Sequence, residues 1–140
     1  MIISRIEKNE RENHPLIITF KKEYLKDFQA VESGDVLLIL HEGDTIYSAL
    51  SFYFPSVDSG NHLNLTEIRS IVKKKGYAKK IIKVLLKIAK NEYKCGIDLL
   101  CAESNIEARR LFEKFGFVKY LNDYSKINYE NIDICEMDLV

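Results

Sequence analysis

A basic turn that contains a glycine is the segment of this chain whose residue types and spacing could bind a ligand. Lys73, Lys74 and Lys75 precede Gly76, and the turn joins an apolar extended segment to a helical pattern. The first N–H groups of a helix have no intrahelical partner, and the helix dipole adds partial positive charge at the same end. Gly76 lets a ligand approach the backbone closely. The turn therefore indicates a pyrophosphate site, although a polar connection between a strand and a helix explains the same residues equally well.

The segments around the turn provide the strand and the helix that such a site needs. Residues 63–72 predict a strand that ends at the turn. Residues 76–94 carry apolar side chains at helical spacing on one face and lysines on the other, which predicts a helix. Residues 97–102 are almost wholly apolar, as expected of a strand that is covered on both faces. The helix therefore connects two strands, which indicates a parallel crossover.

The C-terminal third of the chain predicts a further helix and two strands. Ser104 and Glu107 have the spacing of a capping box that begins a helix, and Gly116 stands where such a helix would end. The two final strands are predicted at residues 117–121 and 132–139, on either side of a polar loop at 122–131.

The N-terminal third predicts a strand, a helix and a hairpin. Residues 2–6 fit a short strand, and Pro15 fits the first turn of a helix that ends near Gly34. Residues 16–20 alone would also fit a strand, but the longer helical spacing favours the helix. The hairpin strands are predicted at residues 35–40 and 45–53, joined at 41–44.

The order of these elements predicts the fold class. It is strand, helix, three strands, helix, strand, helix and two strands. We expect a single domain over residues 1–140 of the α/β (α+β) class. Its central sheet is expected to be mixed and mostly antiparallel, with about six to seven strands and helices on both faces.

The composition excludes several classes of partner and cofactor. Lysine plus arginine and aspartate plus glutamate both number 21, so the net formal charge of zero gives no strong attraction to nucleic acid or to an anionic membrane. The odd number of cysteines, Cys95, Cys101 and Cys135, fits reduced thiols and offers no paired spacing for a metal. No apolar run approaches the roughly 18 residues of a membrane helix. We therefore expect a cytoplasmic protein without a metal.

Two blocks of the chain together resemble one family. Lys73-Lys-Lys-Gly-Tyr-Ala78 resembles the phosphate loop of the GNAT superfamily of acyl-CoA-dependent N-acyltransferases, written Arg/Gln-x-x-Gly-x-Gly/Ala. The segment from Asn105 to Phe117 resembles that family's second signature, Asn-x-x-Ala-x-x-Leu-Tyr-x-x-x-Gly-Phe. The blocks occur in this order, about thirty residues apart, on the strand and helix frame described above. The resemblance covers residues 63–117.

The resemblance implies acetyl-CoA as the co-substrate and a set of residues that bind it. The backbone N–H groups from Lys75 to Lys79 would hold the pyrophosphate, and the main chain of Ile71 and Val72 would bond the pantetheine arm at a splayed strand pair. Asn105 would reach the arm as well; the alternative is that it only begins its helix. The cofactor-binding residues implied are Ile71, Val72, Lys73, Lys75, Gly76, Tyr77, Ala78, Lys79, Asn105 and Phe112.

The resemblance also implies where a catalytic base would lie. Amine acetylation needs a base for the amine and an acid for the leaving thiolate. Glu67, on the strand that leads to the turn, is the candidate base, although it could instead pair with Arg69 or face solvent. Glu103 and His62 are weaker candidates.

The acid position departs from the family pattern. Phe112 stands where the family usually has tyrosine, and its side chain has no proton to give. Tyr124 is our candidate acid, with Tyr77, Tyr120 or water as alternatives. Because a free thiol has a pKa of only about 8.5, the missing acid is expected to slow the reaction more than to abolish it.

The expected function is acetyl transfer from acetyl-CoA to a primary amine of an unidentified acceptor, by direct attack in a ternary complex. The alternative is a non-catalytic acyl-CoA-binding module on the same fold, which Phe112 favours. We expect acetyl-CoA and an amine as partners, and a monomer or a homodimer.

Overall fold

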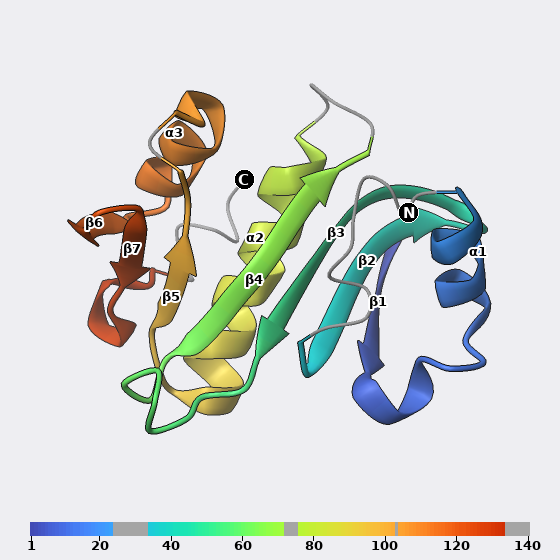
Figure 1. The fold of residues 1–140 in the computed structure, drawn as a ribbon, viewed down its shortest axis with the longest axis horizontal. Coiled ribbons are helices and arrows are strands. Elements are labelled where there is room, and N and C mark those ends of the chain that lie inside the picture. The colour runs from blue at the N-terminus through green and yellow to red at the C-terminus, as the bar shows by residue number, and fades with distance from the viewer. Residues whose placement is uncertain (24–33, 72–75, 103, 134–140) are drawn as a thin grey trace. The chain divides into compact units, whose positions relative to one another are not determined.

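The strands of this protein form one mixed sheet with helices packed against it. In the computed structural model, which describes residues 1–23, 34–71, 76–102 and 104–133, seven strands hydrogen-bond in the order β1-β2-β3-β4-β5-β7-β6 (Figure 1). The strands are β1 (Ile2–Glu7), β2 (Val36–Glu42), β3 (Thr45–Tyr53), β4 (Leu63–Ser70), β5 (Ile97–Leu100), β6 (Val118–Leu121) and β7 (Tyr124–Ile127). The helices are α1 (Pro15–Glu23), α2 (Tyr77–Ile88) and α3 (Ile106–Lys114), with the short turns η1 (Lys8–Glu10), η3 (Ala89–Tyr93) and η4 (Tyr129–Asn131). The predicted fold class is confirmed.

Two compact units divide β4 and α2 between them. The first unit holds Met1–Tyr53 and Thr66–Ile81, and the second holds Phe54–Leu65 and Ile82–Val140. None of the helices in the described ranges is long and apolar enough to cross a membrane.

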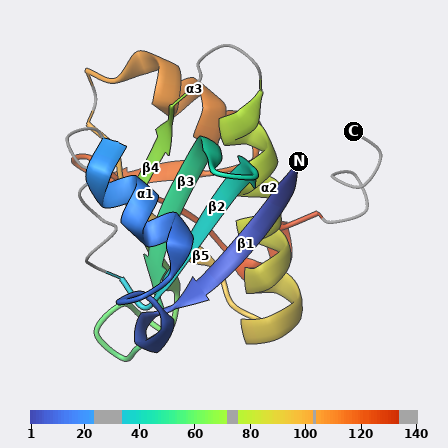
Figure 2. The ribbon, with the colours of Figure 1, turned by 90° about the vertical axis from the view of Figure 1, so that its right-hand side faces the viewer.

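In the first unit, α1 packs on the antiparallel strands β1, β2 and β3 (Figure 2). Pro15 begins α1, where its missing N–H costs nothing. Leu16, Ile17 and Phe20 are buried at helical spacing against strand residues such as Leu37. The predicted helix is thus confirmed as far as Glu23, and the strand alternative for residues 16–20 is wrong. The rest of the predicted helix lies outside the described residues.

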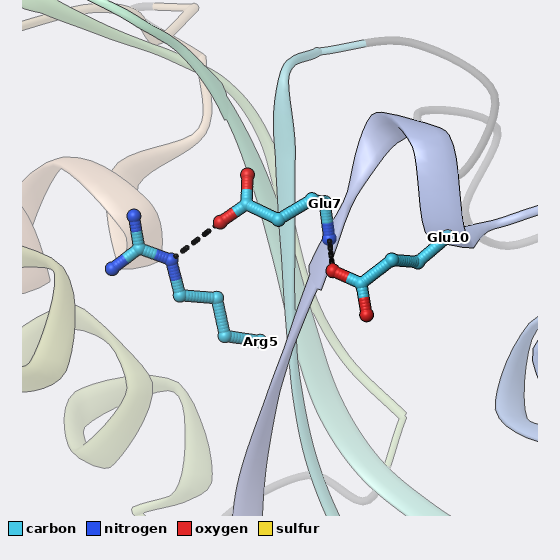
Figure 3. A network of polar contacts seen from close by, with 3 residues as sticks. All are labelled: Arg5, Glu7 and Glu10. Atoms are coloured by element: carbon cyan, nitrogen blue, oxygen red, sulfur yellow. Dashed lines mark hydrogen bonds and ion pairs between the residues drawn. The ribbon is translucent and has the colours of Figure 1, made fainter.

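A small network of polar contacts lies at the end of β1 (Figure 3). Glu10 Oε1 accepts a hydrogen bond of 3.2 Å from the backbone N–H of Glu7, and Arg5 Nε lies 3.1 Å from Glu7 Oε1. Both side chains of the ion pair are partly exposed, so the pair contributes little stability, on the order of 1 kcal/mol or less. The network shapes the turn into η1.

The hairpin between β2 and β3 is tighter than predicted. His41 and Glu42 extend β2, so that only Gly43 and Asp44 form the turn. Gly43 has φ of +58°, a conformation that glycine adopts without strain. His41 belongs to the strand because it pairs with Ile2 of β1 and Ile46 of β3. Its ring lies at the turn, where Nδ1 donates to the Gly43 carbonyl at 2.8 Å and Nε2 lies 2.7 Å from Ser4 Oγ.

In the second unit, the first residues of β4 pair with β5 in parallel, which confirms the predicted crossover. β5 pairs with β7, and β7 with β6, in antiparallel fashion. The prediction of a loop over residues 122–131 was wrong, because β7 lies inside it. Asn122, with φ of +50°, makes the turn from β6 to β7. Residues 132 and 133 form no strand, and residues 134–139 lie outside the described residues.

Several element ends also differ from prediction. α2 passes at Ala89 into the π-helical turn η3, and Lys94 ends it with φ of +50°. β5 stops at Leu100, two residues early. Gly116 follows the end of α3 with φ of +99°, as predicted for a helix C-terminus.

Candidate functional site

The first unit contains the end of β4, where the predicted cofactor strand lies. Ile71 is half-buried, and its N–H donates to the Tyr47 carbonyl of β3 at 2.8 Å. Because successive N–H groups of a strand point to opposite edges, the Ile71 N–H is committed to β3 and does not point toward the other edge. The other main-chain residue predicted to contact a pantetheine arm, Val72, lies outside the described residues.

The predicted phosphate turn enters α2 through Gly76. Gly76 has φ of +72°, and a Cβ built on it would have no heavy atom within 4 Å, so the turn is open on that side. Lys80 N donates to the Gly76 carbonyl at 3.1 Å, which is the first turn of the helix. The N–H groups from Tyr77 to Lys79 therefore stand at the helix N-terminus, where backbone donors have no carbonyl four residues back. Lys73 and Lys75 lie outside the described residues.

Tyr77 fixes the start of α2 against β3. Its carbonyl accepts a hydrogen bond of 3.2 Å from Ser48 Oγ, and its ring centroid lies 4.9 Å from that of Tyr47. Lys80 Nζ lies 5.8 Å from the Tyr77 ring centroid. Tyr77 and Ala78 are half-buried, while Lys79 and Lys80 are exposed. Packing by Tyr77 thus holds the helix N-terminus in place, and the lysines add charge beside it.

Glu67 is a half-buried carboxylate in the middle of β4. The strand is fixed beside it, since Thr66 Oγ1 donates to the Ser51 carbonyl of β3 at 2.9 Å. Glu67 is therefore only partly shielded from solvent by the sheet around it. His62, before β4, is half-buried, and Glu103 lies outside the described residues.

In the second unit, Asn105 begins α3 as its N-cap. Its Oδ1 accepts a hydrogen bond of 3.3 Å from the Ala108 N–H. The capping box predicted from Ser104 and Glu107 is therefore wrong by one residue, because an asparagine is at least as good a cap as a serine. The cap uses only the carbonyl oxygen of Asn105, and the amide NH₂ carries two further donors.

Phe112 lies in the interior of the second unit. It is 5% exposed, and its ring packs edge-to-face on Phe117 with centroids 5.4 Å apart. It also lines a small hollow beneath α3, together with Cys101, Arg109, Glu113, Phe117, Lys119 and Ser125. The ring that replaces the family's tyrosine thus has a packing role in the fold.

Tyr124 is exposed at the start of β7, with its ring centroid 6.1 Å from that of Tyr120. The Tyr120 hydroxyl contacts both carboxylate oxygens of Asp98 at 3.0 Å. Burial, followed by the hydrogen bond and the negative charge of Asp98, raises the pKa of Tyr120 above its usual value. The pairing of Asp98 with Tyr120 was not predicted. The available signal was a single aspartate inside an otherwise apolar strand.

In the described part of the chain, the side-chain types that bind metals do not gather into a site. Among residues 1–23, 34–71, 76–102 and 104–133, no group of three His, Cys, Asp or Glu side chains is arranged to hold a metal ion. Cys95 and Cys101 are free thiols, and burial raises the pKa of both. Cys135 lies outside the described residues.

Known proteins resemble this chain in sequence and in fold. The acetyltransferase (GNAT) domain family matches residues 7–139. A spermine/spermidine N(1)-acetyltransferase of Bacillus subtilis (strain 168) is 32% identical over 105 residues, which cover 71% of this chain and 68% of that protein. The Campylobacter jejuni N-acetyltransferase PseH in complex with acetyl coenzyme A has a TM-score of 0.62 at 15% identity, over 91% of this chain and 99% of that chain. The smu.2055 protein of Streptococcus mutans UA159 has a TM-score of 0.65 at 18% identity, over 92% and 99%. At these identities, the two structures show likeness of fold alone.

Proposed function

Because this chain belongs to the GNAT family of acetyltransferases, which transfer an acetyl group from acetyl-CoA to an amine, we propose that its acceptor is a polyamine of the spermine and spermidine class. The observation that supports this acceptor is the similarity to the Bacillus enzyme, which extends over more than two thirds of both chains. A polyamine presents primary amines on a flexible chain, which suits direct attack on a thioester.

We propose that Glu67 is the general base and Tyr124 the general acid of this reaction. Glu67 takes a proton from the ammonium, and the free amine attacks the carbonyl carbon of the thioester. The new C–N bond forms as the C–S bond breaks, and CoA leaves as a thiolate that takes a proton from Tyr124. The nitrogen of the new amide loses its second proton, which restores the Tyr124 hydroxyl, and Glu67 returns its proton to solvent. The products are the acetylated polyamine and CoA, and no covalent enzyme intermediate forms.

Backbone donors of α2 provide the proposed cofactor contacts. The N–H groups from Tyr77 to Lys79 face the pyrophosphate, and Gly76 leaves room for it. Lys79 adds an exposed positive charge at the same place. In the second unit, the amide of Asn105 contacts the pantetheine arm. Acetyl-CoA supplies the thioester that the amine attacks.

The acceptor is tested by measuring thiol release from acetyl-CoA with a panel of amines. We expect spermine and spermidine to give a kcat/KM at least about tenfold above that of a lysine-containing peptide or an aminoglycoside, since a recognised second ammonium contributes on the order of 1.4 kcal/mol. Equal rates with all amines would contradict the polyamine proposal. Cofactor binding by calorimetry without thiol release from any amine would favour the non-catalytic module.

We further propose that the enzyme acts in the cytoplasm as a monomer or a homodimer, without a nucleic-acid partner. The net formal charge of zero supports a small-molecule acceptor over a polyanion. Light scattering of the purified protein, with and without DNA, tests the oligomeric state and the absence of a nucleic-acid partner.

Replacing Tyr124 by phenylalanine is expected to lower kcat about tenfold and to leave KM for acetyl-CoA unchanged. The effect is smaller than usual for a lost general acid because a thiolate is a tolerable leaving group. Steady-state kinetics measures it. Tyr129→Phe is the matched control, since Tyr129 is also exposed and keeps its ring beneath Lys90 Nζ at 3.9 Å. An equal decrease of kcat in Tyr124→Phe and Tyr129→Phe would contradict a role for the Tyr124 hydroxyl.

Replacing Asn105 by aspartate separates its two roles. Aspartate caps a helix as well as asparagine does and adds negative charge at the helix N-terminus, so the melting temperature should stay constant or rise. It has no amide donor, so KM for acetyl-CoA should rise about tenfold. Ser104→Asp, which adds the same charge one residue earlier, controls for repulsion of the cofactor. An unchanged KM in Asn105→Asp would leave Asn105 as a helix cap alone.

A further inference from the structure

In the second unit, β5, β7 and β6 are neighbouring strands of the sheet (Figure 1). One face of these strands carries aromatic, apolar and charged side chains, several of them exposed. Asp98 lies opposite Lys126, and Leu100 lies opposite Tyr124. Since alternate residues of a strand share a face, these four side chains lie on the same side of the sheet. The intervening residues, such as Leu99, are buried on the other side. Leu100 is 62% exposed and Tyr124 is 41% exposed, so this face is open to solvent in the described part of the chain.

Asp98 and Tyr120 form the polar centre of this face. The hydroxyl of Tyr120 has one proton to donate, and it lies 3.0 Å from both Oδ1 and Oδ2 of Asp98. A carboxylate has about four acceptor positions on its two oxygens, so one phenol does not saturate it. Asp98 therefore keeps the capacity to accept hydrogen bonds from a cation while Tyr120 holds it in place.

An alkylammonium group of the chain itself already lies on this face. Lys126 Nζ is 5.1 Å from the centroid of the Tyr120 ring, within the range of a cation–π interaction. The end of a lysine side chain is a primary ammonium on a methylene chain, and a polyamine has the same chemistry at its ends. The Tyr120 ring thus accepts the type of group that the proposed acceptor carries.

The face also lies beside the proposed general acid. Tyr124 protonates the leaving thiolate in the reaction proposed above, and its ring centroid is 6.1 Å from that of Tyr120. An amine that attacks the thioester next to Tyr124 has its second nitrogen a short methylene chain away. A nitrogen at that distance from Tyr124 would be near the ring of Tyr120 and, through the Tyr120 hydroxyl contact, near the carboxylate of Asp98.

We infer that Asp98 and Tyr120 bind the second ammonium group of the polyamine acceptor, and that Lys126 occupies the Tyr120 ring until the acceptor displaces it. This inference rests on the proposed polyamine acceptor. It makes Asp98 and Tyr120 residues that select polyamines over monoamines, and it gives Lys126 the opposite role of an internal competitor.

The competing explanation is that Asp98 and Tyr120 only stabilise the sheet. Both explanations predict that Asp98→Asn alters the kinetics. Only the binding role predicts that KM for spermidine shifts in opposite directions in Asp98→Asn and Lys126→Gln. Asp98→Asn removes the charge that attracts the ammonium. Lys126→Gln removes both the competitor on the ring and a like charge. A purely structural contact would not make the second variant bind its acceptor more tightly.

The test is steady-state kinetics of the full chain with spermidine and with butylamine as a monoamine. Asp98→Asn should raise KM for spermidine about tenfold, leave kcat within about twofold, and leave both constants for butylamine unchanged. Lys126→Gln should lower KM for spermidine about threefold. Asp58→Asn, the same change at an exposed loop carboxylate, should have no effect. Melting curves of all variants report whether each one folds.

Each outcome bears on one of the two proposals. If wild-type enzyme acetylates spermidine but Asp98→Asn and Lys126→Gln shift KM in the same direction or not at all, the inference is overturned and the polyamine proposal stands. The inference is also overturned if Asp98→Asn raises KM for butylamine by the same factor as KM for spermidine. If wild-type enzyme acetylates no polyamine, the proposed function fails and the inference fails with it.

Discussion

Replacing Glu67 by glutamine is expected to lower kcat for polyamine acetylation by about 100-fold or more and to leave KM for acetyl-CoA constant in steady-state kinetics, if Glu67 is the base as proposed. A primary alkylamine has a pKa near 10, so almost all of the acceptor is protonated at neutral pH and cannot attack. Glutamine has nearly the shape of glutamate but cannot take up a proton. The variant should therefore depend on the small fraction of acceptor that is already deprotonated, and its rate should increase with pH more steeply than that of the wild type.

Arg69→Gln distinguishes catalysis by Glu67 from an ion pair along β4. If the carboxylate served only to neutralise Arg69, removing either partner would have the same effect on the rate. We expect Arg69→Gln to keep kcat within about threefold, because an exposed ion pair contributes roughly 1 kcal/mol or less. A glutamine variant at position 67 with full activity at neutral pH would rule out Glu67 as the base.

The segment from β4 to β5 could be predicted from the sequence because local and long-range signals agree there. The apolar residues of α2 repeat at helical spacing. Ile97 of β5 is buried, so β5 must pack against other apolar side chains. Parallel strands need a crossover connection, which is usually a helix of this kind. The structure pairs Leu63 with Ile97 in parallel, in agreement with that expectation.

The C-terminal strands could not be placed in the same way. β7 reads Tyr-Ser-Lys-Ile and β6 reads Val-Lys-Tyr-Leu, and every residue of β6 is exposed. A strand at the edge of a sheet with one open face can hold polar side chains, so polarity alone does not indicate a loop. The turn at Asn122 needs a positive φ in a residue other than glycine, which sequence patterns signal only weakly.

The candidate site also has parts that the sequence predicts and parts that it does not. The Gly76 turn is contiguous in sequence, so its residue types could be interpreted directly. Asp98 and Tyr120 come together only because β7 lies between β5 and β6, and this requires the strand order and the register. The cap of α3 was misplaced by one residue because Ser104 and Asn105 are both good caps, and only the backbone geometry decides between them.

Gly76 offers the sharpest test of the cofactor turn, because the chain contains a matched control. We expect Gly76→Val to weaken CoA binding about 100-fold in calorimetry. A valine side chain would project into the space proposed for the pyrophosphate, and losing two charge-assisted hydrogen bonds costs about 3 kcal/mol. A Cβ at position 76 would meet no heavy atom of the described protein within 4 Å, so the fold leaves room for the first atom of the new side chain.

Gly43→Val controls for the strain of the substitution. Gly43 also has a positive φ, +58° against +72° for Gly76, and a Cβ there also meets no heavy atom within 4 Å. Valine in this left-handed region should therefore destabilise both variants by a similar amount, roughly 1 to 3 kcal/mol, which melting curves will show. Gly43 lies in the β2–β3 hairpin, so Gly43→Val should bind CoA like the wild type. If both variants lost affinity equally, the loss would come from strain. If Gly76→Val bound CoA normally, the pyrophosphate would not lie at this turn, and the helix N-terminus would have to be excluded as its site.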